Sequence, residues 1–374
     1  MFGCSRRGER MDCELSLLLI FKNYVKNQIE KMMNDEVESY RLREFRERLL
    51  VKKIYRAGYR LRVLDTVVGS IELQVPRLRE KMIDFSFFQK WQRRTKTLEK
   101  SIYNLMSYGL SHSYTSLVVK NFNKMVVSDH VCKSIKNMSL PEVYDFNNKE
   151  IECPDFVILD ATWKGRNMCI LSALGLYIKD GICEKKLLAF KAYHSESTDT
   201  WDDFIYRFLY LRGIRKENGL KAFIADGMKG INQAVKRYSM DTEILGCFFH
   251  FQKNIFDYAR DKGIMRKEAK VFTDDIKNIF YQKTKNKAWC TFEEIIKKYE
   301  HTKYKPLVNF IKKRMLHQLR FYDHKSEYWE YIRTISYIER FFKEIKRKLK
   351  HWTYIKSLDD MEKAFWLSFK GYQM

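Results

Sequence analysis

Apolar and polar positions alternate along this chain with spacings that change from region to region, and each spacing predicts a different element. Residues 13–56 mix charged and apolar side chains at helical spacing, without proline or glycine, which predicts two helices. Residues 57–78 alternate with a period of two around Gly69, which predicts a β-hairpin ending at Pro76. The chain therefore opens with a helical region followed by a hairpin.

Residues 97–137 return to helical spacing and predict three short helices. Gly109 marks the end of the first helix, Ser111 is the expected cap of the second, and the third is expected to start near Ser128. Two helices joined by a glycine turn are typical of a helix-turn-helix, but equally of an ordinary helical hairpin. The pattern leaves both interpretations open.

Beyond a polar, proline-marked linker at 140–155, the pattern changes to short apolar strands. Strands are predicted at 156–160, 168–178, 186–193, 222–226 and 244–249, with helices at 199–212 and 228–238. This order, βββ-α-β-α-β, is the order of a ribonuclease-H-like domain. Residues 251–330 are lysine-rich, aromatic and helical, which predicts an all-α insertion before closing helices at 335–350 and 357–370.

The predicted fold class is therefore α/β: a ribonuclease-H-like catalytic core interrupted by an all-α insertion and preceded by a helical, helix-turn-helix-like DNA-binding region. The predicted regions are an N-terminal helical region (1–56), a DNA-binding region (57–145), the first part of the core (146–250), the insertion (251–330) and the closing helices (331–374).

The net charge of the chain narrows the class of partners that we expect. The 71 lysines and arginines exceed the 47 acids and give a net charge of +24, which favours a polyanion such as nucleic acid over a protein that is merely basic. The apolar run at 15–21 is much shorter than the ~20 residues that a membrane span needs, so no membrane association is expected. Eight scattered cysteines without a CxxC pair indicate a reducing compartment.

Two of the apolar strands end on acids, Asp160 and Asp226, and a third acid, Glu339, opens a basic helix. In a ribonuclease-H-like sheet the two strands are neighbours, so the carboxylates would meet and would need a divalent cation to offset their repulsion. Two Mg²⁺ ions held by such acids can activate a water or a 3′-hydroxyl for phosphodiester chemistry. The alternative is that Asp226 only caps the following helix.

The helix from residue 338 carries one apolar stripe and one charged stripe. The apolar stripe is Ile338, Phe342, Ile345 and Leu349, and the charged one is Glu339, Lys343, Lys346 and Lys350. The charged stripe is either a solvated face or, beside two other acids, a track for phosphates. Cys247 and His250 form a CxxH pattern that reads as a core cysteine with a polar histidine, or more weakly as half of a zinc site.

An ordered set of short blocks adds to this interpretation. The blocks cover residues 69–77, 92–94, 108–111, 159–162, 196–201, 211–213, 225–227, 247–250, 253–254, 338–341 and 346–347. Together they resemble the Mutator-like bacterial and archaeal insertion-sequence transposases, a group of DDE transposases with a CxxH signature. Ser336 and Phe342 depart from the family, which often has asparagine at both positions.

The resemblance implies a transposase that cleaves and joins DNA with two Mg²⁺ or Mn²⁺ ions and no organic cofactor. The acids Asp160, Asp226 and Glu339 would be catalytic and would bind the metal. Residues near the site or on DNA would be Cys247, His250, Arg340, Lys343, Lys346, Arg347 and Lys350. The residues expected to bind the terminal inverted repeats are Arg77, Arg79, Arg93, Arg94, Ser111 and His112.

The implied partners are double-stranded DNA, both the terminal repeats and the target, and a second copy of the chain on that DNA. The implied location is the nucleoid of a prokaryotic cytoplasm. Two alternatives remain: a catalytically decayed or repurposed DNA-binding protein, and a ribonuclease-H-like nuclease without a joining step.

Overall fold

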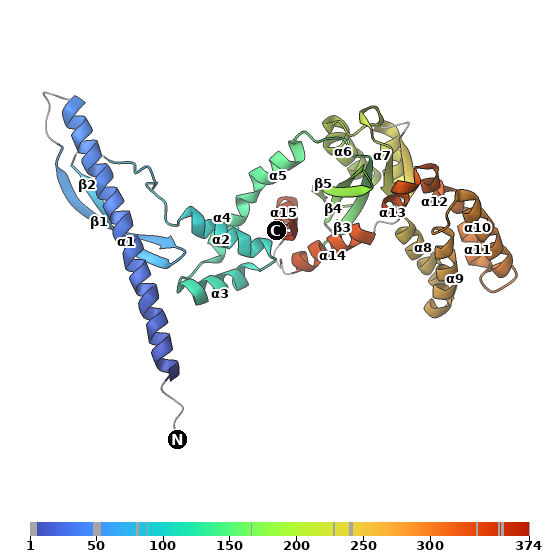
Figure 1. Cartoon of the computed structure of the whole chain (residues 1–374), viewed down its shortest axis with the longest axis horizontal. Helices are drawn as coiled ribbons and strands as arrows, with labels where there is room; N and C mark the ends of the chain where they lie inside the picture. Colours follow the sequence, from blue (N-terminus) through green and yellow to red (C-terminus); the bar gives the residue numbers. More distant parts are fainter. Residues whose placement is uncertain are drawn as a thin grey trace, which may run out of the picture. The chain divides into compact units, whose positions relative to one another are not determined.

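The computed structural model divides the chain into two compact units, residues 1–138 and residues 139–374, and each is described by itself (Figure 1). The structure describes the backbone of residues 6–47, 54–79, 82–87, 89–165, 167–226, 229–238, 242–333, 336–350, 352 and 355–373. Side chains are described for the same residues except 6–16, 44–47, 229, 336–340 and 373.

The first unit opens with one long helix, α1 (Arg6–Glu47). The prediction of two helices in 13–56 is wrong, because that range holds no proline or glycine to stop the first helix. α1 packs against the second strand of an antiparallel hairpin, β1 (Arg56–Thr66) and β2 (Gly69–Leu78). The predicted hairpin is present, although β2 continues past Pro76.

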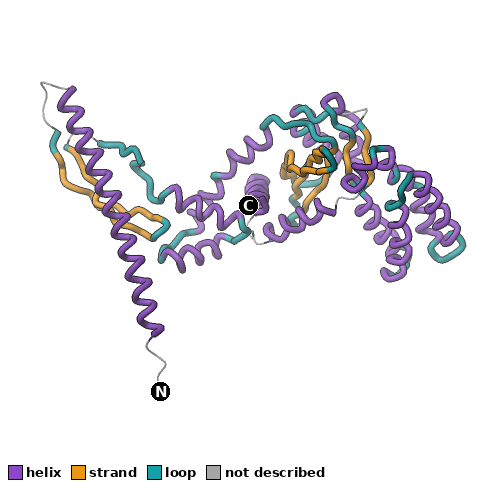
Figure 2. The backbone as a smooth tube through the Cα atoms, in the orientation of Figure 1, coloured by secondary structure: helices purple, strands orange, loops and turns teal. Residues whose placement is uncertain are grey.

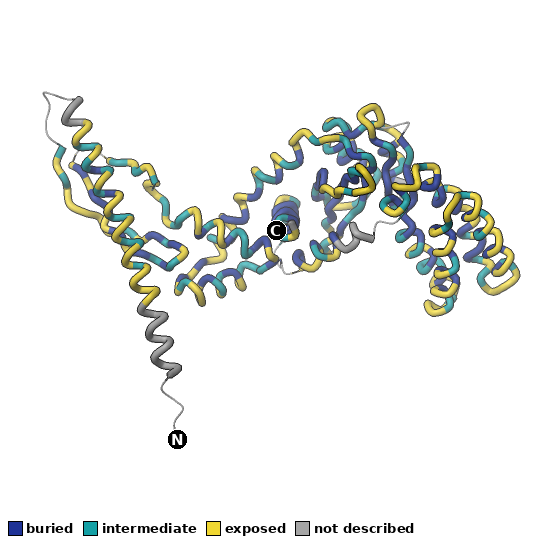
Figure 3. The backbone as a smooth tube through the Cα atoms, in the orientation of Figure 1, coloured by how far each residue is buried: buried dark blue, intermediate teal, exposed yellow. Residues whose placement is uncertain are grey.

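The hairpin and α1 share a small core. Met33 of α1 packs with Leu64 of β1 and with the alternating residues Ile71, Leu73 and Val75 of β2. Leu64 lies directly opposite Ile71, so the period-two pattern of the sequence becomes one buried face. Each apolar side chain buried in this way contributes about 1.5–3 kcal/mol relative to exposure. The other face of β1 stays exposed (Figure 3).

Three short helices complete the first unit and pack on one another: α2 (Lys96–Ser107), α3 (His112–Asn123) and α4 (Asp129–Asn137). Each begins at a residue whose hydroxyl accepts a backbone N–H of the first turn, namely Thr95, Ser111 and Ser128. Gly109 has a φ of +92° just after α2, a conformation that glycine adopts without strain.

The second unit is built on a five-stranded mixed sheet, which confirms the α/β class (Figure 2). Its strand order is β5-β4-β3-β6-β7, with β3, β4 and β5 antiparallel and β3, β6 and β7 parallel. The strands are β3 (Phe156–Trp163), β4 (Cys169–Lys179), β5 (Ile182–Tyr193), β6 (Ala222–Ala225) and β7 (Glu243–Gly246).

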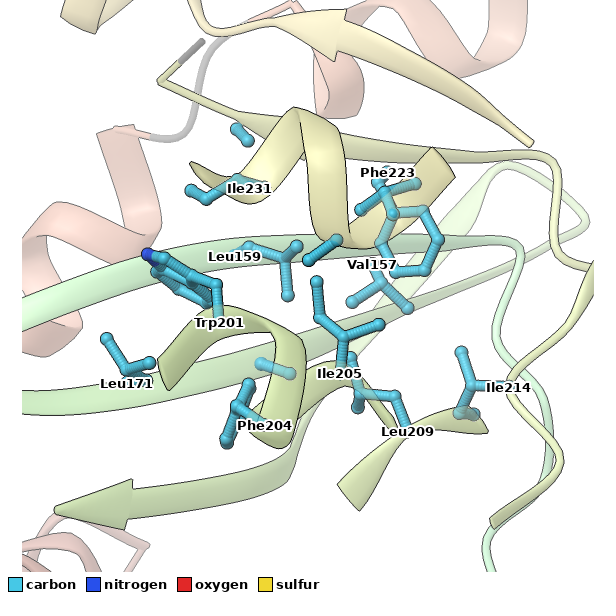
Figure 4. Packing of buried hydrophobic residues seen from close by; sticks show 14 of the residues in the cluster. Val157, Leu159, Leu171, Trp201, Phe204, Ile205, Leu209, Ile214, Phe223 and Ile231 are labelled. Atoms are coloured by element: carbon cyan, nitrogen blue, oxygen red, sulfur yellow. The ribbon is translucent and has the colours of Figure 1, made fainter. Parts of the chain in front are cut away.

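Helices cover both faces of the sheet. On one face, α6 (Thr198–Phe208) and α7 (Lys229–Tyr238) bury Trp201 and Ile205 against Val157, Leu159 and Phe223 (Figure 4). On the other face, α5 (Ser139–Asn148) and α15 (Leu358–Gln373) pack on β5.

The predicted linker at 140–155 is wrong in its first half, because α5 occupies it. Pro141 is tolerated there, since it lies in the first turn of the helix, where a missing N–H costs no internal hydrogen bond.

The described residues between β7 and the closing helix α14 (Ser336–Lys350) form helices joined by short turns and contain no strand, as predicted. The α-helices of this insertion are α8 (Phe248–Asp261), α9 (Arg266–Ile279), α10 (Lys285–Tyr299), α11 (Lys305–Lys312), α12 (Met315–Gln318) and α13 (Trp329–Ile332). No helix in the described ranges is long and apolar enough to cross a membrane.

Candidate active site

The two predicted catalytic aspartates lie at matching positions of neighbouring parallel strands. Ile158 of β3 pairs with Ile224 of β6, so extending the register by two residues places Asp160 opposite Asp226. Asp226 directly follows β6, as expected. Asp160 does not end its strand, because β3 continues to Trp163 alongside β4, but it lies just beyond the part of β3 that pairs with β6.

Asp160 is a part-buried carboxylate with few compensating partners. The Ala161 N–H donates to its Oδ1 at 2.9 Å. Burial raises the pKa of Asp160 to about 7, against the lowering effects of this hydrogen bond and of the Lys346 charge. The negative charges of Asp226 and Glu196 raise the pKa of Asp160 further. The carboxylates are therefore close enough to repel one another.

Glu196 was not among the predicted catalytic residues, although the structure places it beside the two aspartates. The indole N–H of Trp163 donates to its Oε2 and that of Trp201 to its Oε1, both at 3.2 Å. Burial raises the pKa of Glu196 and the charge of Asp226 acts in the same direction, while the two indole hydrogen bonds lower it. The available sequence signal was the glutamate itself, five residues before a tryptophan.

The CxxH pattern lies next to Asp226, in a different element from the one predicted. β7 ends at Gly246 and α8 starts at Phe248, so the predicted strand at 244–249 is too long. An apolar run of this length does not distinguish a strand from a buried helical turn. The buried Cys247 precedes α8, and its backbone N–H donates to the carbonyl of Ala225 at 3.1 Å. This bond ties the start of α8 to the residue before Asp226.

His250 faces Asp226 and two lysines. Burial lowers the pKa of His250, and the charges of Lys253 and Lys346 lower it further, while Asp226 acts to raise it. Its Nδ1 is buried and has no hydrogen-bond partner among the described residues. The neutral ring is thus available to accept a hydrogen bond at Nδ1 or to donate one, depending on its tautomer.

α14 provides the basic side of the site. Three residues of its predicted apolar stripe are buried, namely Phe342, Ile345 and Leu349, while the side chain of the fourth, Ile338, lies outside the described residues. The Lys164 ammonium donates to the Leu349 carbonyl at 2.7 Å and joins the end of the helix to the turn after β3. Lys346 acts on both Asp160 and His250, and so faces the site.

The other predicted residues of α14 are placed as follows. Lys343 and Lys350 are exposed, and Arg347 pairs with Glu344 at 2.9 Å. The side chains of Glu339 and Arg340 lie outside the described residues. Glu339 occupies the helix seven residues before Lys346, hence on the same face and about 10.5 Å along the axis.

Asp160, Asp226 and Glu196 are called the acidic cluster below. Within the described side chains, no group of three or more histidines, cysteines and acids is arranged to hold a metal ion. The third predicted ligand, Glu339, is not among those side chains. The acidic cluster therefore supplies two facing aspartates and a glutamate held by two indoles, and Lys346 lies beside it.

The residues predicted to bind DNA lie in the first unit. Arg77, Arg79 and Arg93 are exposed, whereas Arg94 pairs with Glu99 at 3.3 Å. The Ser111 hydroxyl accepts the backbone N–H of Tyr114 and so caps α3. His112 is the first residue of that helix.

Comparison with known proteins identifies the same family that the sequence blocks resemble. The family described as "Transposase, Mutator family" matches residues 12–356. The chain is 26% identical over 269 residues to the transposase for insertion sequence element IS256 in transposon Tn4001 of Staphylococcus aureus, which covers 70% of this chain and 66% of that relative. The chain thus spans slightly less than two thirds of the relative's length.

Two further relatives are similar over longer segments. The transposase for insertion sequence element ISRM5 of Rhizobium meliloti is 22% identical over 79% of this chain and 73% of its own length. The transposase for insertion sequence element IS1201 of Lactobacillus helveticus is 24% identical over 79% of this chain and 78% of its own length.

Proposed function

This chain belongs to the Mutator family of transposases, and from that premise we propose that it cleaves the ends of an insertion sequence and joins them to target DNA. The observation that carries the proposal is the register of the parallel strands, which sets Asp160 opposite Asp226. Both acids lie in the family blocks named above, and the net charge of +24 suits a DNA substrate.

The two facing aspartates of the acidic cluster suit divalent cations. Asp160 is desolvated and lies near two further carboxylates, so its ionised form is disfavoured until a cation offsets the repulsion. Asp160, Asp226 and Glu339 would hold two Mg²⁺ or Mn²⁺ ions, which prefer such oxygen ligands. When bound, these ions supply an activated water or 3′-hydroxyl and stabilise the leaving oxygen.

The surrounding residues bind and orient the DNA. Lys346 faces the acids and would contact the phosphate next to the scissile bond, with Lys253 beside it. His250 would orient Asp226, whose charge acts on its ring, and Cys247 keeps its helix against the residue before Asp226. The hydrogen bonds from the indoles of Trp163 and Trp201 hold the Glu196 carboxylate in place near the two aspartates.

The remaining parts of the proposal concern fold and partners. The strand order β5-β4-β3-β6-β7 supports a ribonuclease-H-like core. Helices α2 and α3, which are joined by the turn at Gly109 and pack on each other, support a helix-turn-helix that reads the terminal inverted repeats. Because two DNA ends must be brought together, we propose that the active form is a dimer or larger on DNA, acting at the nucleoid of a prokaryotic cytoplasm.

A strand-transfer assay with Mg²⁺ tests the proposal. Asp160→Asn, Asp226→Asn and Glu339→Gln are each expected to lose cleavage and joining while still binding DNA. Asp261→Asn is a matched control, because this exposed carboxylate lies at the end of α8. Wild-type activity in any of the three variants would overturn the assignment of that acid. Nicked DNA without joined product from the wild-type chain would indicate a nuclease instead.

A further inference from the structure

A loop segment of the first unit runs along the free edge of the hairpin. The Asp65 N–H donates to the Arg93 carbonyl at 2.8 Å, and the Thr95 N–H donates to the Asp65 carbonyl at 2.9 Å. The Arg62 guanidinium donates to the carbonyls of Gln89 and Gln92. These bonds hold the backbone of residues 89–95 against β1.

A cavity of about 470 Å³ lies between β1 and this segment. The described residues that line it comprise four cations and one acid, together with Val63 and Trp91: Arg60, Arg62, Lys90, Arg93 and Asp65. The Asp65 carboxylate also accepts the Ser70 hydroxyl at 2.7 Å. We call this group the arginine cavity.

The arginines of the cavity repel one another. Burial lowers the pKa of Arg62, and the charges of Arg60 and Arg93 lower it further. Arg62 donates hydrogen bonds to the backbone carbonyls of Gln89 and Gln92, which hold it in place. Neighbouring arginines are stabilised most by an anion that accepts hydrogen bonds from several of their N–H groups at once, and a phosphate has this chemistry.

Trp91 stands exposed at the rim. It is 79% exposed, and the Lys90 ammonium lies 5.5 Å from the centre of its ring. A second cavity of about 530 Å³ shares Lys90, Trp91 and Arg93 with the first. The indole therefore lies between two cavities lined by cations. A nucleotide whose phosphate binds in one of these cavities could pack its sugar or base against the ring.

We propose that the arginine cavity binds a phosphate of the DNA backbone and that Trp91 packs against the neighbouring nucleotide. The proposal rests on the transposase function and deepens it. It adds Arg60, Arg62, Lys90 and Trp91 to the DNA-contacting residues and gives Arg93 a defined role. The site belongs to the hairpin edge and is separate from helices α3 and α4.

Fluorescence anisotropy tests the proposal with the full chain and a labelled duplex from the end of its own element, over a series of salt concentrations. The double variant Arg60→Gln/Arg93→Gln is expected to bind at least tenfold more weakly, with the salt slope reduced by about 1–2 units. Lys283→Gln/Lys313→Gln, which removes two exposed lysines of the insertion, is the matched control. Unchanged affinity and slope in the arginine variant, or an equal loss in the control, would overturn the arginine cavity as a DNA site.

Trp91 gives an independent readout. Trp91→Ala is expected to lower DNA affinity about tenfold, and Trp91→Phe to retain most of it, because packing on the sugar of a duplex nucleotide needs only a flat apolar ring. Quenching of tryptophan fluorescence by DNA should be smaller in Trp91→Phe than in the wild-type chain. Equal quenching in both would contradict the packing of Trp91 on a nucleotide. Failure of the wild-type chain to bind any duplex would sink the transposase function itself, whereas binding that survives all these changes would sink only this site.

Discussion

The acidic cluster of the second unit and the arginine cavity of the first are opposite solutions to the same physical problem. Each gathers like charges beside a residue of opposite charge, Lys346 in the first case and Asp65 in the second. Like charges are costly to hold together unless a ligand of opposite sign neutralises them. The two regions therefore point to two ligands, a divalent cation and a phosphate.

The regions differ in how the charges are positioned. Asp160 and Asp226 come from adjacent parallel strands, and the sheet fixes their separation. The arginines come from β1 and from a loop that is attached to its edge by a few hydrogen bonds. A rigid strand register suits a site where atoms must be placed for reaction, whereas an edge-and-loop site suits backbone binding, which tolerates small displacements.

The largest expected effect is the loss of strand transfer when one aspartate of the acidic cluster is replaced. Asp226→Asn should lower strand transfer by more than about 100-fold, a loss larger than that of a typical outer-shell partner. In the absence of metal the same variant should be more stable by about 1 kcal/mol, because one of the repelling charges is gone. Thermal unfolding in chelator, beside the activity assay, measures both. A variant that loses activity by unfolding would contradict the repulsion argument.

A second experiment separates the two ligands. Mg²⁺ at ten times its Kd should stabilise the wild-type chain by about 1.4 kcal/mol, because it binds only the folded state. Thermal unfolding with and without Mg²⁺ should show this shift in Arg60→Gln/Arg93→Gln and not in Asp160→Asn. A shift that persists in Asp160→Asn would place the cation elsewhere in the chain.

Glu196 sharpens the definition of the acidic cluster. Glu196→Gln should weaken Mg²⁺ binding about fivefold, since a neighbouring charge contributes about 1 kcal/mol at an intermediate effective dielectric. Gln still accepts one of the two indole hydrogen bonds, so the fold should be retained. Calorimetric titration measures the affinity, with Glu217→Gln in an exposed turn of the same unit as the control. Equal affinities in wild type and Glu196→Gln would remove Glu196 from the cluster.

The two regions also differ in how far the sequence predicts them. Asp160 and Asp226 were predictable as neighbours, because the order of strands and helices fixes which strands are adjacent. Glu196 was not, because its position depends on indoles from two elements, Trp163 in β3 and Trp201 in α6. The side-chain geometry of Glu339 stays a prediction.

In the first unit, too, features that depend on nearby residues could be predicted from the sequence, whereas a feature that depends on distant residues could not. The hairpin and the caps Ser111 and Ser128 follow from local chemistry and are confirmed. The arginine cavity depends on a loop that lies far from β1 in the sequence. Gln92, which accepts a hydrogen bond from Arg62, is 30 residues further along the chain. Periodicity carries no information about such a contact.

The smallest expected effect tests the internal counter-charge. Asp65→Asn keeps an oxygen that can accept the Ser70 hydroxyl but removes the one acid among the described residues that line the arginine cavity. DNA affinity should rise two- to threefold, in line with the roughly 0.5 kcal/mol expected of a partly exposed ion pair. Anisotropy at low salt measures this, with the exposed Asp84→Asn as the control of equal charge. Equal tightening in both variants would mean that only net charge matters. A rise confined to Asp65→Asn would show that the cavity itself holds the phosphate, because only there does the carboxylate compete with the ligand.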